Sequence, residues 1–119
     1  MRDHTKLRAF ELADLLVLDI YRLTRDFPDD ERFGLTSQLR RASVSTASNI
    51  VEGSARSSLA DYISFLDIAY GSSKEVEYQL SIAARLGFVE TTSVSTVVER
   101  ATETSKVLHG LIRSLRNKV

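Results

Sequence analysis

The sequence predicts an all-α protein, an up-down-up-down antiparallel bundle of four helices that forms one domain over residues 1–119. Two observations lead to this prediction. Apolar residues recur at steps of three or four along four long stretches, which is the period of a helix with one buried face. The chain also has a single proline, Pro28, and only five glycines, so few positions interrupt long helices.

The first helix is expected over residues 5–27. Its apolar stripe is wide and keeps helical spacing, through Phe10, Ala13, Leu16, Val17, Ile20, Leu23 and Phe27. Leu15 and Leu18 fall on the other side, among charged residues. Scattered exposed leucines are common, but two of them on one solvent side also fit a contact with another subunit. We therefore name Leu15 and Leu18 as candidate oligomer contacts and keep both interpretations.

The second helix is expected over residues 35–56, after the proline and an acidic run. Phe33 and Leu35 are expected to cover the open end of the core, and Thr36 or Ser37 to cap the helix. This helix is unusually rich in small side chains, which are Ala42, Ser43, Ser45, Thr46, Ala47 and Ser48. Small side chains let another backbone come close, so we place this helix at a crowded centre.

The third helix is expected over residues 59–86, with Ser58 as its cap. Gly71 lies in the middle of it, where glycine costs about 1 kcal/mol relative to alanine. We expect a close approach to the small residues of the second helix to explain this glycine. Gly87 is expected to stop the helix, and the fourth helix to cover residues 91–119.

No catalytic or metal-binding pattern emerges, so we predict neither an enzyme nor a cofactor. His4 and His109 lack a second ligand at a useful spacing, and the chain has no cysteine. Phosphate-cradling and nucleophile motifs are absent from the sequence. The N-terminus has no apolar signal region, and no apolar run is long enough to cross a bilayer. We therefore expect a cytoplasmic protein without a membrane partner.

One polar constellation stands out, formed by Arg41, Asn49, Glu52, Arg56, Ser72 and Glu75. Glu52 precedes Arg56 by four residues, the favourable order for an ion pair on a helix. Glu75 falls within the apolar arc of the third helix, where a carboxylate is costly unless it is paired. We expect Glu75 to pair with Arg41 or a neighbouring group, in the same subunit or the next. The alternative is an exposed surface charge.

Two motifs resemble a known family. They are RRASVSTASNIVEGSAR, in the second helix, and YISFLDIAYGSSKEVEYQL, in the third. Together they resemble the bacterial four-helix bundle proteins, whose founders are encoded in intervening sequences of large-subunit ribosomal RNA genes. The family also includes the accessory variability protein of diversity-generating retroelements. The resemblance covers nearly the whole chain and implies a closed homo-oligomer, a pentameric ring, but no defined molecular activity.

Two classes of function stay open at this stage. The first is a non-enzymatic oligomeric scaffold or adaptor that meets a protein or nucleic-acid partner. The second is an RNA- or DNA-binding accessory protein, as the relatives imply, with contacts from Lys6, Arg8, Arg22, Arg25 and Arg40. The chain has 16 basic and 16 acidic residues, and this neutral balance favours the first class because non-specific phosphate binding needs excess positive charge.

Overall fold

The computed structural model describes residues 2–119 and is all-α over that range. Four long helices are present, and they are α1 (Arg8–Thr24), α2 (Leu35–Ser54), α3 (Leu59–Arg85) and α4 (Thr91–Arg116). Two short 3-10 turns, η1 (His4–Lys6) and η2 (Asp29–Glu31), precede α1 and α2. The bundle is elongated, with extents of 45 × 23 × 19 Å. The predicted fold class is therefore confirmed at the level of four helices without strands.

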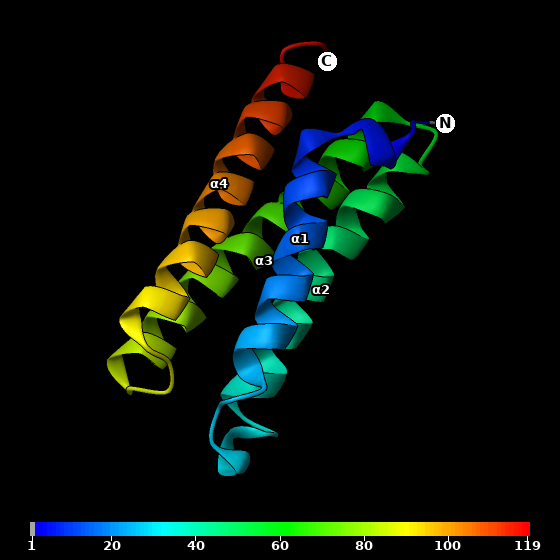
Figure 1. The fold of residues 1–119 in the computed structure, drawn as a ribbon. Coiled ribbons are helices and arrows are strands. Elements are labelled where there is room, and N and C mark those ends of the chain that lie inside the picture. The colour runs from blue at the N-terminus through cyan, green and yellow to red at the C-terminus, as the bar shows by residue number, and fades with distance from the viewer. Residues whose placement is uncertain (1) are drawn as a thin grey trace.

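Each helix packs against two others, which fixes the order around the bundle (Figure 1). The neighbouring pairs are α1 with α2, α2 with α3, α3 with α4, and α4 with α1. The diagonal pairs make no backbone contact, so α1 and α3 lie at opposite corners, as do α2 and α4. Because consecutive helices alternate in direction, α1 and α3 run the same way. Both ends of the described residues lie at the same end of the bundle (Figure 1).

The helix starts differ in part from the sequence prediction. Ser58 caps α3 as expected, because its side chain accepts a hydrogen bond from the Asp61 amide at 3.0 Å. For α2 the expected cap was wrong, because the cap position is Gly34 and no side chain of that residue can serve. Glu31 compensates from η2, since its Oε1 accepts the hydrogen bond of the first helical amide, that of Leu35, at 2.9 Å.

The cover of the core before α2 and the end of the first helix also differ from the prediction. Leu35 is buried as expected, but Phe33 is 88% exposed and does not cover the core. The first helix is shorter than predicted, since it begins at Arg8 and ends at Thr24. Leu7 has an extended backbone and separates η1 from α1. The Thr24 hydroxyl donates back to the Ile20 carbonyl at 2.7 Å in this last turn. The glycine stop after α3 is confirmed, with Gly87 at a φ of 75°.

The core has two apolar halves with a layer of buried hydroxyls between them. One half includes Leu16, Leu39, Leu80 and Val97, and the other includes Ile50, Leu66, Leu108 and Ile112. The residues that lie between them along the helices are Ser43, Thr46, Ser73, Thr104 and Ser105, which we call the hydroxyl layer. Each hydroxyl of this layer can bond a backbone carbonyl one turn earlier on its own helix, so none is left without a partner.

The close approach between α2 and α3 occurs at Gly53, and the prediction that Gly71 makes it was wrong. A Cβ added at Gly53 would lie 2.8 Å from the Phe65 Cβ and 3.3 Å from the Tyr62 ring. A Cβ added at Gly71 would meet nothing within 4 Å. Burial in this tight junction raises the pKa of the Tyr62 phenol, although a hydrogen bond to Ser54 opposes the shift. Gly53 is therefore the residue that lets the two helices meet.

We predict opposite effects for alanine at two helical glycines. Gly53→Ala should destabilise the protein by about 1–3 kcal/mol, because the new methyl group overlaps a side chain on α3. Gly110→Ala should stabilise it by about 0.5–1 kcal/mol, because Gly110 is exposed within α4 and has open space around it. Urea unfolding of both variants tests this, and equal changes would contradict the packing at Gly53.

Candidate functional site

The first candidate site is the polar seam between α2 and α3 that the sequence singled out. The Ser45 and Ser72 hydroxyls hydrogen-bond each other across the two helices at 2.8 Å. The Asn49 side chain amide donates to the Ser45 carbonyl at 2.8 Å and to its hydroxyl at 3.1 Å. Asn49 and Ser72 are thus brought together through Ser45. This seam consists of short, neutral groups that hold two helices close.

The Glu52–Arg56 ion pair has the spacing expected from the sequence. Arg56 Nη2 lies 3.2 Å from Glu52 Oε1, with both side chains about half exposed. The Arg56 guanidinium also lies over the Phe65 ring of α3, 4.6 Å from its centre. Solvent screens an exposed pair of this kind, so its contribution to stability is about 0–1 kcal/mol. The stacked arginine ties the end of α2 to α3 more than the ion pair does.

Glu75 and Arg41 do not pair with each other within the bundle, so that intramolecular prediction was wrong. Both side chains are exposed, and Glu75 accepts one hydrogen bond from the Gln79 side chain at 3.2 Å. Glu75 lies on the solvent side of α3 rather than in its buried arc, so it does not require a partner. Both residues line an open cleft of about 460 Å³ between α2 and α3, together with Gln38, Ala42, Ser45 and Ser72.

The five basic residues named as nucleic-acid contacts do not form one surface. Lys6 and Arg8 lie at the end of the bundle that holds the termini, whereas Arg22 and Arg25 lie at the other end of α1. About 20–25 Å separates the two groups at 1.5 Å per helical residue. Arg40 is engaged within the bundle, because its guanidinium stacks on Tyr21, at 4.6 Å from the ring centre.

Leu15 and Leu18 lie on the outer side of α1. They are 37% and 44% exposed, so each leaves more than a third of its surface open to solvent. The structure therefore keeps both available to another molecule.

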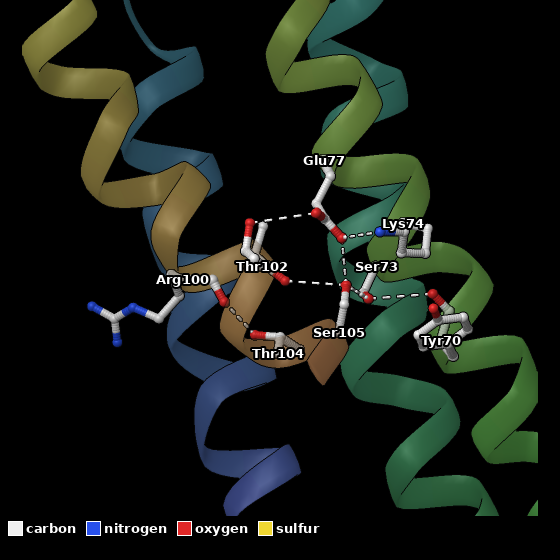
Figure 2. A network of polar contacts seen from close by, with 9 residues as sticks. Tyr70, Ser73, Lys74, Glu77, Arg100, Thr102, Thr104 and Ser105 are labelled. Atoms are coloured by element: carbon white, nitrogen blue, oxygen red, sulfur yellow. Dashed lines mark hydrogen bonds and ion pairs between the residues drawn. The ribbon is translucent and has the colours of Figure 1, made fainter. Parts of the chain in front are cut away.

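A second polar site, which sequence reasoning missed, joins α3 to α4 (Figure 2). Glu77 of α3 accepts hydrogen bonds from two residues of α4, from Ser105 at 2.6 Å and from Thr102 at 3.4 Å. Lys74 lies 3.2 Å from the same carboxylate. Ser73 and Ser105 of the hydroxyl layer hydrogen-bond each other beneath it. Figure 2 shows these side chains converging from the two helices.

This network has the properties of a structural lock rather than a reaction centre. The Glu77 side chain is 21% exposed, and it is satisfied by donors on both of its oxygens. Ser73 is buried, and Ser105, which borders an open cleft, has its hydroxyl bonded to the Glu77 carboxylate and to Ser73. His109 lies beside the Tyr70 ring, with 5.7 Å between the ring centres, at the edge of a cleft of about 270 Å³. The feature of the sequence that could have indicated the Glu77 network is the presence of polar residues at core spacing on two successive helices.

Neither a metal centre nor a membrane span is found in the described chain. Over residues 2–119 there is no group of three or more histidine or acidic side chains that could hold a metal ion. None of the helices in that range is long and apolar enough to cross a membrane.

These features define an all-α four-helix protein in which polar groups join α2 to α3 and α3 to α4. The model of the 23S rRNA-intervening sequence protein family matches residues 5–110, so the chain belongs to that family. A crystal structure with the same fold is that of a protein of unknown function from the S23 ribosomal protein family of Bacteroides thetaiotaomicron. It is 24% identical, has a TM-score of 0.81, and the match covers 88% of this chain and 95% of that one. None of the curated proteins compared with the chain matches it.

We predict that Glu77 contributes more to stability than any exposed acid of α4. Glu77→Ala should cost about 1–3 kcal/mol, because Ser105 and Thr102 lose their shared acceptor in a partly buried site. Glu103→Ala, at an exposed position of the same bundle, should change stability by less than about 0.5 kcal/mol. Lys74→Ala should also have a small effect, since that lysine is half exposed. Urea unfolding measures all three, and an effect of Glu77→Ala no larger than that of Glu103→Ala would contradict the lock.

Proposed function

We propose that this protein is a non-enzymatic scaffold that assembles with copies of itself and presents the outer surfaces of its bundle to a partner. The observation that carries the proposal is the set of apolar side chains on outward faces. Leu18 on α1 is 44% exposed, and Ile68 and Tyr78 on α3 are 52% and 62% exposed. Exposed apolar side chains on two outer faces of a small protein favour contacts with other proteins on both faces. The resemblance described above favours a ring of five.

The hydrogen bonds that join the helices within residues 2–119 favour a scaffold. The polar groups of the α2–α3 seam and of the Glu77 network are bonded within the bundle, and the buried hydroxyls face neighbouring helices. We infer that the partner meets the outer surface rather than an interior site.

A second candidate function is nucleic-acid binding, and one observation favours it. The end of the bundle that holds the termini is rich in arginine and lysine, through Arg2, Lys6, Arg8, Arg56, Arg113, Arg116 and Lys118. Acidic residues at the same end offset part of this charge, because Glu52 pairs with Arg56, Asp67 pairs with Arg116, and Asp3 and Asp61 also lie there. In an oligomer whose copies point the same way, this basic end would be repeated on one rim and would attract phosphates more strongly than a single chain does.

Light scattering with and without a short structured RNA tests the two candidates. We expect a mass several times the 13.3 kDa of one chain, and about five times for the proposed ring. For a scaffold that meets protein partners, RNA should not change this mass at either about 50 or about 200 mM salt. Binding at low salt that weakens as the salt rises would favour the nucleic-acid candidate instead. A monomer at all concentrations would contradict the scaffold.

The double variant Lys6→Glu/Arg113→Glu tests whether the basic end binds the RNA. Both residues are exposed and lie at the basic end. Their reversal should abolish RNA binding if the basic end carries it, and should leave the mass of the protein alone unchanged. The same double reversal at Arg32 and Arg85, which are exposed near the other end of the bundle, should leave any RNA binding intact.

A further inference from the structure

Two outward helix faces of this bundle have the same residue spacing. On α1 and its C-cap residue, the exposed residues at alternating steps of four and three are Glu11, Leu15, Leu18, Arg22 and Arg25. On α3 the exposed residues at the same steps are Ser64, Ile68, Gly71, Glu75 and Tyr78. This spacing is the heptad pattern with which one helix packs along another. We call these two sets the α1 stripe and the α3 stripe.

The α3 stripe contains a glycine that the single bundle does not explain. Gly71 lies in the middle of a 27-residue helix, where glycine is unfavourable. It is exposed, and a Cβ at this position would meet nothing within 4 Å. The apolar side chains of Ile68 and Tyr78 flank it on the same face, and both are more than half exposed. A small residue between exposed apolar ones is what a close contact with another helix requires.

We propose that the α1 stripe of one copy packs in parallel along the α3 stripe of the next copy. This inference rests on the proposed self-assembly and names the surfaces that form it. Because α1 and α3 lie at opposite corners, their stripes face away from each other within one bundle. Every copy therefore presents one stripe of each kind, and the contact is heterologous, with α1 of each copy on α3 of its neighbour.

The apolar residues match when the two stripes are aligned in parallel. Leu15 then lies opposite Ile68, which buries two exposed aliphatic side chains against each other. Leu18 lies opposite Gly71, where the open space beside the glycine accommodates the leucine side chain as a knob enters a hole. The residue that is unfavourable in the single helix becomes the one that admits the neighbouring helix.

The charged residues select the same alignment. Arg22 lies opposite Glu75, and Arg25 lies opposite the ring of Tyr78, over which a guanidinium can stack. Among the ion pairs of residues 2–119, neither Arg22 nor Glu75 has a partner. An antiparallel alignment about the same apolar centre would set Glu11 against Glu75, which is repulsive. Charge complementarity thus favours the parallel, heterologous contact.

Charge reversal tests the pairing directly. Arg22→Glu alone and Glu75→Arg alone should each weaken self-association about tenfold or more, as measured by sedimentation velocity across a range of protein concentrations. The double variant Arg22→Glu/Glu75→Arg should restore it, because the pair is then reversed across the interface. The two residues lie at opposite corners of one bundle, so restoration cannot come from within a copy. A double variant no better than the singles would overturn the proposal.

Replacement of the exposed glycines gives an independent test. Gly71→Gln should raise the Tm of the dissociated chain or leave it unchanged, and should weaken self-association by at least tenfold, because the new side chain fills the space for Leu18. Gly110→Gln is the matched control, at an exposed glycine in the middle of α4 with equally open surroundings. It should leave self-association unchanged. Equal effects of the two variants on association would overturn the proposal.

Cross-linking distinguishes this contact from other pairings, because the natural chain has no cysteine. The double variant Leu18→Cys/Gly71→Cys should give disulfide-linked chains longer than two copies under oxidation. Dimers from Leu18→Cys alone would indicate that α1 pairs with α1, and dimers from Gly71→Cys alone that α3 pairs with α3. Either result would overturn the heterologous contact.

The proposed function can fail separately from this contact. If the unmodified protein is a monomer in light scattering, both the scaffold proposal and the contact between the stripes are contradicted. If it is an oligomer whose mass survives both charge reversals, the scaffold stands and the assignment of the two stripes is wrong.

Discussion

The close packing of α2 on α3 is the constraint from which the rest of the bundle follows. Gly53 removes the side chain that would otherwise separate the helices at Phe65, and Ser45 meets Ser72 further along. With these two helices fixed, α1 packs against α2 and α4 packs against α3, and the remaining contact between α1 and α4 closes the bundle. Small residues, rather than large apolar ones, therefore set the distance around which the core is filled.

Polar groups inside the bundle set its register. An apolar core alone permits neighbouring helices to slide, since many alignments bury similar areas. The hydroxyl layer and Glu77 hold α3 and α4 at one alignment, because Ser105 reaches both Ser73 and the Glu77 carboxylate only there. Such specificity is a known role for polar residues in helical packing. The family membership of the chain and its shared fold with the S23 protein agree with a bundle of defined shape.

The sequence predicted the helices well because long apolar periodicity and the Ser58 cap are local signals. It failed where the outcome depends on contacts between distant residues. Gly53 and Gly71 cannot be told apart locally, yet one is tightly packed and the other open. Glu75 was placed in the buried arc because the arc of α3 is wide, and a small rotation moves that residue to the solvent side. The Glu77 network was missed because its partners lie on another helix, 25 and 28 residues further along the chain.

The even number of helices has a consequence for how this protein can be joined to others. Both ends of the described chain lie at the same end of the bundle, and the N-terminal end contacts the junction of α2 and α3. A domain fused to either terminus would therefore emerge on that side, while the η2 loop and the turn between α3 and α4 would remain uncovered at the other. An assembly with all copies pointing the same way would therefore carry every fused domain on one of its two sides and leave the other side free.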